Sequence, residues 1–493
     1  MIQEEKDRLS RLEKLRAAQI DPYPTQGQRT HLAEEVLQQF DDLLEKKVTV
    51  KILGRVRLLR KHGGLTFAQI QDQSGIIQVA LRKDVLGQEA YDFFHETIDV
   101  GDFLEVSGQV FLTKKGEKTV EIANHRLLSK AILPLPEKWH GLSDVEARFR
   151  KRYLDLIMSD DVRTRLTLRS KIISSIRSLL DARGFLEVET PTLQPVYGGG
   201  FARPFVTHHN ALDTDFYLRI SDEMYLKRLL VGGFEKVYEI TKVFRNEGLD
   251  RDHNPEFTMF EAQIAYENYE YGMDLFEEIF ETAAVQALGS PEIQQEDVVV
   301  SVKRPWKRLR LIDAVEEIGG VMKSVWTNPE EARAVLQKKL PTSAHPDLNR
   351  MKTTGEMMAY AFEMLVEEHL IQPTIIYDYP VEVSPLAKKC PADPRFVERF
   401  EAFAMGSEIG NNYSELNDPV DLEKRFLEEK DREAAGFDEA HQTDTDYLEA
   451  IKHGMPPACG LGIGIDRMVM LLTGAKNIKE VILFPTLRPS REG

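Results

Sequence analysis

The segment from residue 235 to residue 266 constrains the fold most, because it reads as two strands on either side of a short polar loop. In the first run, EKVYEITKVFRNEG, alternate side chains would share one face of a strand. The run EFTMFEAQIAY alternates in the same way after the loop GLDRDHNP. The segment therefore predicts an antiparallel pair of strands.

This strand pair would collect charged and aromatic side chains at one place. Arg245 and Glu247 fall on one face of the first run, and Phe257 and Glu261 share a face of the second. Such a pocket suits a substrate with anionic and cationic ends and a ring to stack, and His253 in the loop could reach a triphosphate. The alternative is a surface hairpin with salt bridges, and this segment taken alone favours that alternative.

A glycine-rich run, GLGIGIDRMVMLL, adds a second candidate for anion binding. Its glycines at 460, 462 and 464 alternate, which lets a flat group approach the backbone of a strand closely. Arg467, at the junction with a helix, would offer a fixed pair of donors to phosphate. The run fits neither the dinucleotide-binding fingerprint nor the Walker loop.

An acidic run, SEIGNNYSELND, is a candidate metal site. Glu408 and Glu415 are seven residues apart, so a straight strand would place them on opposite faces. Only a bend at Gly410 and Asn411 could bring both to one cation, and oxygen ligands would then favour Mg²⁺ held against phosphates. A solvated acidic turn is the alternative.

At 493 residues the chain is expected to contain more than one domain. Residues 48 to 130 contain five short strands with glycine turns, which predicts a small barrel of the OB-fold type. Arg60, Phe67 and Gln78 on its strands are residue types that read unstacked bases, although a phenylalanine in a strand is more often core. The proline-rich ILPLPEKW reads as a linker, and residues 301 to 372 are expected to be mostly helical.

Composition narrows the class of protein. The net charge of −17 argues against a protein that coats nucleic acid along its whole surface, although residues 48 to 152 have four more basic than acidic side chains. That local excess fits contact with a polyanion at one place or compositional noise equally well. No apolar run is long enough for a membrane span, and the N-terminus does not resemble a signal peptide. The two cysteines are far apart in the sequence, which disfavours a cysteine zinc site. A cytoplasmic protein is expected.

Together these runs resemble the class II aminoacyl-tRNA synthetases. GFLEVETP resembles their motif 1, FRNEG with HNPEF resembles motif 2, and GLGIGIDR resembles motif 3, whereas the class I signatures HIGH and KMSKS are absent. The helix RFRKRYLDL after an N-terminal barrel is similar to the aspartate, asparagine and lysine subgroup. Within that subgroup, GGGFARPF, THHNALD, VSPLA and SELNDP resemble the lysyl-tRNA synthetases, and the likeness covers nearly the whole chain.

The resemblance implies an α+β fold, with an N-terminal OB-fold barrel and a catalytic domain that has a mainly antiparallel sheet flanked by helices. The expected boundaries are 1–135 for an N-terminal helix with the anticodon-binding barrel, 136–160 for a linker and arm helix, and 161–493 for the catalytic domain with a helical insertion at about 301–372. A homodimer through the motif 1 helix is the family expectation.

The implied activity is that of a lysine–tRNA ligase, which activates L-lysine with ATP to lysyl-adenylate and pyrophosphate and then transfers lysine to the 3′ end of tRNA(Lys). Arg245 would bridge the lysine carboxylate and the α-phosphate, and Arg467 would hold the γ-phosphate; these are the implied catalytic residues. The implied ATP-binding set is Arg245, Glu247, His253, Asn254, Phe257, Glu408 and Arg467. Glu408 and Glu415 would hold Mg²⁺ on the β- and γ-phosphates, and no zinc is expected.

The implied lysine-binding set is Gly199, Glu223, Arg245, Glu261, Gln263, Asn411, Tyr413 and Glu415. Buried carboxylates left unpaired by a shorter or uncharged amino acid would be costly, so rejection can be steep without an editing site. The family often has tyrosine where this chain has Gln263, which can still accept a hydrogen bond near the substrate's ε-ammonium.

Arg60, Phe67 and Gln78 match anticodon-contact positions, so tRNA(Lys) with the anticodon UUU or CUU is the expected partner. Asn124 stands where related enzymes often carry glutamate. The rival interpretations are a synthetase for aspartate or asparagine, a paralogue that lysylates a protein, and a non-catalytic RNA-binding protein of the same fold. Glu223 and Glu415 disfavour the first, the barrel disfavours the second, and Arg245, Glu247 and Arg467 disfavour the third.

Overall fold

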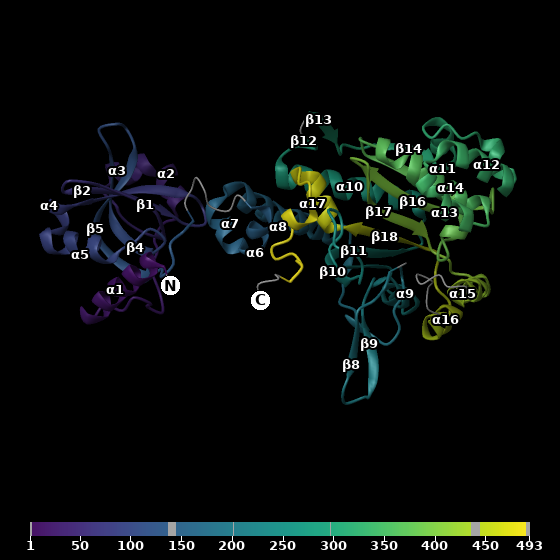
Figure 1. The fold of residues 1–493 in the computed structure, drawn as a ribbon, viewed down its shortest axis with the longest axis horizontal. Coiled ribbons are helices and arrows are strands. Elements are labelled where there is room, and N and C mark those ends of the chain that lie inside the picture. The colour runs from purple at the N-terminus through teal and green to yellow at the C-terminus, as the bar shows by residue number, and fades with distance from the viewer. Residues whose placement is uncertain (1, 137–143, 201, 296, 435–443, 490–493) are drawn as a thin grey trace. The chain divides into compact units, whose positions relative to one another are not determined.

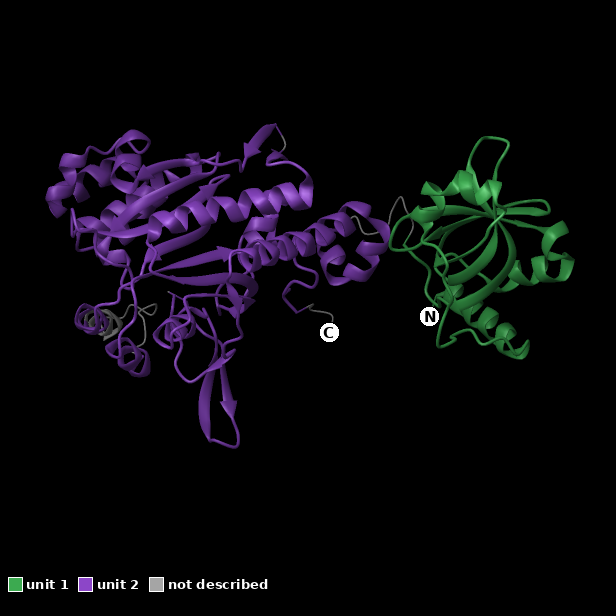
Figure 2. Ribbon diagram, turned by 180° about the vertical axis from the view of Figure 1, so that it is seen from behind, with its two compact units in different colours: residues 1–143 green, residues 144–493 purple. Residues whose placement is uncertain are grey.

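The computed structural model describes residues 2–136, 144–200, 202–295, 297–434 and 444–489. Its residues group into two compact units, Met1–Ser143 and Asp144–Gly493 (Figure 2). The start of the expected linker, residues 137–143, and Phe201 of the run GGGFARPF lie outside the described residues. Residues 144–160, expected in a separate linker and arm, belong to the second unit, where Arg152 is buried and donates to the carbonyls of Lys479 and Leu483.

The first unit contains the expected five-stranded barrel. Its strands are β1 (Thr49–His62), β2 (Leu65–Gln71), β3 (Ile76–Arg82), β4 (Phe103–Leu112) and β5 (Lys118–Ser129), closed in the order β1-β2-β3-β5-β4. Only β3 and β5 pair in parallel. Inward side chains alternate along each strand, as Val50, Ile52 and Val56 do on β1, and they form one apolar core.

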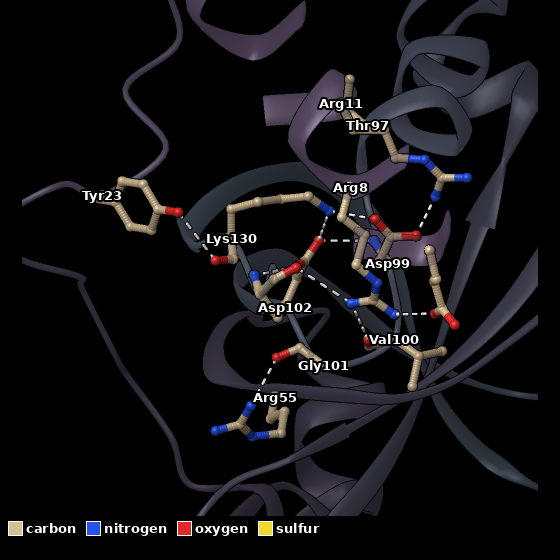
Figure 3. A network of polar contacts seen from close by, with 12 residues as sticks. Arg8, Arg11, Tyr23, Arg55, Thr97, Asp99, Val100, Gly101, Asp102 and Lys130 are labelled. Carbon is tan, nitrogen blue, oxygen red and sulfur yellow. Dashed lines mark hydrogen bonds and ion pairs between the residues drawn. The ribbon is translucent and has the colours of Figure 1, made fainter. Parts of the chain in front are cut away.

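Short helices surround the barrel: α1 (Gln3–Ala17), α2 (Ala33–Gln38), α3 (Phe40–Glu45), α4 (Lys83–Leu86) and α5 (Gln88–Thr97). Leu12 and Leu15 on α1 are buried, and an ionic network ties this helix down (Figure 3). Arg11 pairs with Asp99, and Arg8 donates to two carbonyls. Lys130 Nζ, also fully buried, lies 2.5 Å from Asp99 Oδ2 and 2.7 Å from Asp102 Oδ2.

The second unit is built on an eight-stranded sheet in the order β14-β15-β16-β17-β18-β11-β10-β6 (Figure 1). The strands are β6 (Leu186–Glu187), β10 (Lys236–Phe244), β11 (Glu256–Ala265), β14 (Lys307–Arg310), β15 (Thr374–Pro380), β16 (Phe396–Ala404), β17 (Ser407–Ser414) and β18 (Ala458–Gly464). Only the two outer pairs, β14 with β15 and β6 with β10, are parallel. The fold is therefore α+β with a mainly antiparallel sheet, as expected.

Long helices cover one face of this sheet. The apolar sides of α8 (Asp160–Ala182), α10 (Tyr269–Leu288) and α17 (Ile465–Thr473) share a core with strands β10, β11, β16, β17 and β18. Shorter elements precede α8 or extend this region: α6 (Val145–Arg150), α7 (Arg152–Met158), η5 (Ile478–Glu480) and the ribbon of β12 (Glu292–Gln295) and β13 (Val298–Ser301). The opposite face is therefore left for a cavity.

The expected helical insertion begins later than predicted. Residues 307–310 form β14 of the main sheet, so the helices start at Leu311. They are α11 (Leu311–Glu317), η1 (Lys323–Thr327), α12 (Pro329–Lys339), η2 (Thr342–Ala344), α13 (His345–Arg350), α14 (Thr354–Leu365) and η3 (Glu367–His369). They share a second apolar core with β15 and β16.

The remaining elements surround the cavity. A small sheet of β7 (Leu193–Gln194), β9 (Thr214–Leu218) and β8 (Val206–His209) includes a hairpin that extends away from the main sheet (Figure 1). The run FLEVETPTL supplies the two-residue strands β6 and β7, one on either side of Pro191. The other elements are α9 (Glu223–Val231), η4 (Val381–Val383), α15 (Pro419–Ala434) and α16 (Thr445–Lys452). In the described part of the chain, no helix has the length and apolar character needed to cross a membrane.

Candidate active site

A cavity of about 420 Å³ lies on one face of the large sheet, with strand β18 as its floor. The floor is flat because β18 presents Gly460, Gly462 and Gly464 there, opposite Gln263, Glu261 and Met259 of β11. On the other side, β17 places Tyr413 opposite Gly460 and Asn411 opposite Gly462. The alternating glycines thus form a track between two walls of functional side chains, as the sequence suggested.

Gly460 is required by a contact that crosses β18. A Cβ at this position would come within 2.2 Å of Glu415 Oε1 and 2.4 Å of Gln263 Nε2. Those two side chains, from strands on either side of β18, hydrogen-bond at 2.8 Å over the glycine. Gly199, another expected site residue, has φ of +84° and would bring a Cβ within 2.8 Å of Ser221 Oγ.

Arg245 lies in the cavity, directly after β10 ends at Phe244. Its backbone N–H donates to the Pro255 carbonyl, which continues the hairpin past the last residue of the strand. Its guanidinium carbon lies 5.2 Å from the centre of the Phe257 ring, and its Nε is buried without a hydrogen-bond partner among the described residues. Burial lowers the pKa of Arg245, while Glu247, Glu261 and Glu408 oppose that change. Arg245 therefore brings a cation to the cavity wall and keeps one buried donor unused.

Arg467 lies in the first turn of α17, at the other side of the cavity. Its Nη1 donates to the Glu408 carbonyl at 2.8 Å, and its Nη2 lies 3.2 Å from His253 Nε2. His253 is exposed, and its Nδ1 contacts Asp250 at 2.8 Å. Arg467 and His253 are thus together at the rim of the cavity.

Two other expected nucleotide contacts differ in character. Glu247 lies beyond the end of β10 and is exposed at the cavity wall. Asn254 also lines the cavity, but its side chain is buried and bonded to backbone: Nδ2 donates to the Glu256 carbonyl, and Oδ1 accepts from Thr486 N–H. Asn254 therefore shapes the loop, and its side-chain groups are already engaged.

The far end of the cavity is acidic and buried. Glu223 begins α9, Glu415 follows β17, and Gln263 and Tyr413 lie between them on the walls. The Tyr413 hydroxyl donates to Glu223 Oε1. Burial and the charge of Glu223 raise the pKa of Glu415 to about 7, although Lys227 opposes this.

Glu261 lies between Arg245 and that acidic end, on β11. It accepts hydrogen bonds of 2.9 and 3.1 Å from Ser221 Oγ. Burial and the nearby charge of Glu223 raise its pKa to about 7. The neighbouring Asp222 is fully buried, and burial with the charges of Glu261 and Glu239 raises its pKa well above the ordinary range.

The structure does not bring Glu408 and Glu415 to one cation. Seven residues of nearly continuous strand separate them, which is roughly 20 Å at the rise of a β-strand. Glu415 is paired with Lys227 at 2.6 Å and with Gln263, whereas Glu408 contacts Arg467. The expected pairing of these two glutamates at one cation is wrong. A register shift beside Glu408 lets both side chains line the cavity, but the length of strand between them keeps them apart.

The carboxylate that does lie near Glu408 is Glu401 of the adjacent strand β16. Both line the cavity, and Glu408 is one of the charges that raise the pKa of Glu401, after burial and against the opposing effect of Arg399. Glu401 accepts a hydrogen bond of 2.8 Å from Tyr379 and pairs with Arg399. Within the described residues, no three His, Cys, Asp or Glu side chains gather where they could hold a metal ion by themselves.

On the barrel, the three expected anticodon contacts share one outward face. Arg60 on β1 is directly opposite Phe67 on β2, and Gln78 on β3 is opposite Gln69 of β2. Their neighbours Thr66 and Ala68 point into the core, so the alternation sends Phe67 outward, where it is partly exposed. Asn124 is exposed on β5.

Several cavity residues were not singled out from the sequence: Gly200, Ser384, Arg399 and Glu401. Ser221, which is buried and donates to Glu261, was not singled out either. Arg399 and Glu401 alternate along β16, a pattern that was visible, but the register that places them beside Glu408 was not. Lys227, which touches two of the acidic residues from behind the cavity wall, carried no signal in the sequence at all.

Comparison with known proteins gives two family matches. Residues 144–488 match the family described as tRNA synthetases class II (D, K and N), and residues 50–128 match the OB-fold nucleic acid binding domain. A lysine–tRNA ligase of Carboxydothermus hydrogenoformans is 50% identical over 484 residues, which cover 98% of each chain. Lysine–tRNA ligases of Enterococcus faecalis (49% identical, 98% of this chain and 96% of the relative) and Moorella thermoacetica (48%, 98% of each) are also similar.

Proposed function

The chain belongs to the class II tRNA synthetases of the D, K and N group, and on that premise we infer that it is a lysine–tRNA ligase. It activates lysine with ATP and transfers it to tRNA. The observation that carries this conclusion for the site itself is the set of carboxylates Glu223, Glu261 and Glu415 in one cavity with Arg245. Lysine has two ammonium groups, which would pair with these carboxylates, and one carboxylate, which would pair with Arg245.

Arg245 is proposed to hold the two reacting groups together. The carboxylate of lysine must attack the α-phosphate of ATP, and a cation between these two anions reduces their repulsion. The ring of Phe257 against the guanidinium holds this cation at the cavity, where both anions would meet. No protein nucleophile is required, because positioning and charge neutralisation are sufficient for this displacement.

ATP is proposed to lie along the other part of the cavity. Phe257 offers a ring face for adenine, and Arg467 with His253 forms the cationic rim for the terminal phosphate. Glu247 and the loop shaped by Asn254 would enclose the nucleotide. This arrangement supports the expected roles of these residues, with Asn254 acting through the loop backbone.

Lysine is proposed to extend from Arg245 toward the acidic end. Glu261, fixed by Ser221, would pair with the α-ammonium, and Asn411 and Gly199 border that part of the cavity. Glu223, Gln263, Tyr413 and Glu415 would surround the ε-ammonium. An amino acid without a side-chain cation would leave buried carboxylates unpaired. Leaving a buried charge unpaired costs on the order of several kcal/mol.

Mg²⁺ is proposed to bind at Glu408 and Glu401. The residues fit the ion, because Glu408 keeps about a third of its side chain exposed in the cavity and Glu401 lies within reach of its charge. Two carboxylates with phosphate oxygens are a typical Mg²⁺ environment. When bound, the ion would neutralise charge on the β- and γ-phosphates; Arg467 and His253 would orient the same phosphates from the other side.

The barrel is proposed to bind the anticodon of tRNA(Lys) through Arg60, Phe67 and Gln78, since an aromatic ring beside an amide and a guanidinium suits unstacked bases.

The reaction is expected in the cytoplasm, where its substrates are.

A homodimer through the motif 1 region is a further proposal. Leu186 of β6, at the edge of the large sheet, and Leu193 of β7 leave nearly half of their surface exposed. Sedimentation should give about twice the chain mass of 56.4 kDa, and a monomer at micromolar concentration would contradict the proposal.

Pyrophosphate exchange into ATP, measured with one amino acid at a time, tests the function. Lysine alone should support exchange by the full-length protein with Mg²⁺. Exchange with aspartate or asparagine in place of lysine would overturn the substrate assignment, and no exchange with any amino acid would favour the non-catalytic interpretation.

A further inference from the structure

Lys227 is a fully buried cation that lies just outside the proposed lysine pocket. It is one turn along α9 from Glu223, to which its Nζ is bonded, and Nζ lies 2.6 Å from Glu415 Oε2. The ring centre of Tyr413 is 5.1 Å from Nζ. Glu223, Tyr413 and Glu415 all line the cavity, whereas Lys227 does not. The ammonium therefore contacts the acidic end from behind.

Within the described part of the chain, this arrangement leaves two acceptors without a donor at the acidic end of the cavity. Oε1 of Glu223 receives both Lys227 and the Tyr413 hydroxyl, so Oε2 of that carboxylate remains available. The amide of Gln263 donates to Glu415 Oε1 at 2.8 Å, and its own Oε1 is buried without a hydrogen-bond partner among the described residues. A buried acceptor without a donor is costly, and a bound ammonium would supply three N–H groups to this end of the cavity.

Lys227 also sets the charge that the pocket presents. Burial would lower the pKa of Lys227, but Glu223 and Glu415 outweigh that effect and raise it well above the ordinary range, so the side chain is charged. With both carboxylates ionised, which the pKa of about 7 for Glu415 allows above neutral pH, the two carboxylates and the ammonium leave a single net negative charge. One side-chain ammonium balances it. Without Lys227, the two carboxylates would repel each other and one would take up a proton.

Resting on the proposed function, we propose that Lys227 is a positioning residue for amino-acid selection: from outside the pocket its ammonium holds Glu223 and Glu415 at a fixed spacing and leaves them one net negative charge, which matches the single ε-ammonium of lysine. Selectivity then depends on a cation of the protein that never touches the substrate. The length of the substrate is read by the fixed spacing between this end and Arg245.

The alternative is that Lys227 only joins α9 to the end of β17 as a structural tie. The barrel offers a matched case, because Lys130 is an equally buried lysine that joins Asp99 to Asp102. None of these three residues lines the cavity of the proposed active site. A substitution at Lys130 therefore reports the cost of losing a buried lysine bridge without any effect on amino-acid selection.

Lys227→Met in the full-length protein tests the proposal, because methionine keeps an unbranched side chain of similar length and removes the charge. Titration calorimetry would measure lysine and ATP affinity separately, and pyrophosphate exchange would compare lysine with ornithine, which is one methylene shorter. We expect lysine affinity to fall at least about tenfold, the preference for lysine over ornithine to narrow at least about fivefold, and ATP affinity to stay within about twofold. Lys130→Met should change none of the three.

Lys227→Gln, which keeps hydrogen-bond donors without charge, provides a second variant if methionine prevents folding, and Lys227→Arg should restore part of the lysine preference. Unchanged lysine affinity and preference in a variant that binds ATP would overturn the proposal. Loss of ATP binding together with lysine binding in both neutral variants would overturn it too, because Lys227 would then support the whole domain. Failure of the wild-type protein to exchange with lysine would instead contradict the proposed function.

Discussion

At the scale of single residues, Arg245 combines two properties that rarely occur together in one side chain. It is a cation held in place by an aromatic ring and by the end of a strand, and it keeps a buried donor without a partner. Such a donor is stabilising only when an anion arrives, so it favours a state in which substrates are bound.

Replacing Arg245 by alanine should therefore lower lysine-dependent pyrophosphate exchange at least roughly 10²-fold, the scale for losing one preorganised charge stabiliser. Arg395→Ala is a matched control, because Arg395 is exposed and pairs only locally with Asp393 in the same unit. An exchange rate near that of the control would remove Arg245 from the mechanism.

Glu261 makes lysine binding dependent on pH. Its pKa in the free protein is raised to about 7 by burial and Glu223, so a fraction is protonated at neutral pH. An α-ammonium favours the ionised carboxylate, so binding should release protons, and lysine affinity should fall as the pH drops from about 8 to about 6. Calorimetry in buffers of different ionisation enthalpy would measure the proton release.

Glu415 has a pKa raised to about 7 as well, so it contributes to the same pH window. Glu261→Gln should keep the part of the pH dependence that belongs to Glu415 and lose the rest. Lysine affinity that does not change over this pH range in the wild-type protein would show that both carboxyls are already ionised.

The sequence pattern was sufficient to group site residues whose side chains alternate along a single strand. The alternation of Phe257, Glu261 and Gln263 was sufficient to place them on one wall. The pattern was not sufficient where a contact depends on a neighbouring strand. Glu401 lies beside Glu408 because of the register between β16 and β17, and that register cannot be read from the sequence. Lys227 was missed because a lysine in a helix is ordinarily exposed, and only tertiary packing buries it.

At the scale of elements, the glycines of β18 leave space over the strand, and neighbouring side chains use that space to form the site. The hydrogen bond between Gln263 and Glu415 passes over this strand, so the two walls of the cavity are joined across it. The sequence predicted close approach to the glycine track, but not that two protein side chains would use part of it. Strands β6 and β7 on either side of Pro191 are short, with only two residues in each.

Gly460→Ala should damage lysine binding selectively. The added Cβ would meet Glu415 Oε1 at 2.2 Å and Gln263 Nε2 at 2.4 Å, so both side chains must move and the acidic end must reorganise. We expect KM for lysine to rise at least about tenfold while KM for ATP stays within about twofold. Gly75→Ala, whose added Cβ meets nothing within 4 Å, is the control. Equal effects on both substrates would indicate a general disturbance of the sheet.

At the scale of the whole molecule, the two units carry different sites: the second unit holds the cavity proposed for lysine and ATP, and the first holds the face proposed for tRNA. The cavity is built entirely from residues of the second unit, and the outward face with Arg60, Phe67 and Gln78 belongs entirely to the first. Each unit has its own apolar core. A substitution on the barrel face should therefore affect tRNA without affecting the reaction of lysine with ATP.

Phe67→Ala tests that division. Loss of one aromatic stacking surface should weaken tRNA(Lys) binding by about 1–3 kcal/mol, because base stacking on a single ring is worth that much. Pyrophosphate exchange needs no tRNA and should stay within about twofold of wild type. Phe103→Ala provides the control, because Phe103 is partly exposed on β4 and packs against Arg55 away from the proposed face. If tRNA binding were equally weak in both variants, Phe67 would not be a specific contact. If exchange collapsed in Phe67→Ala, the barrel would support the catalytic unit structurally, and the separation of tasks between the two units would be wrong.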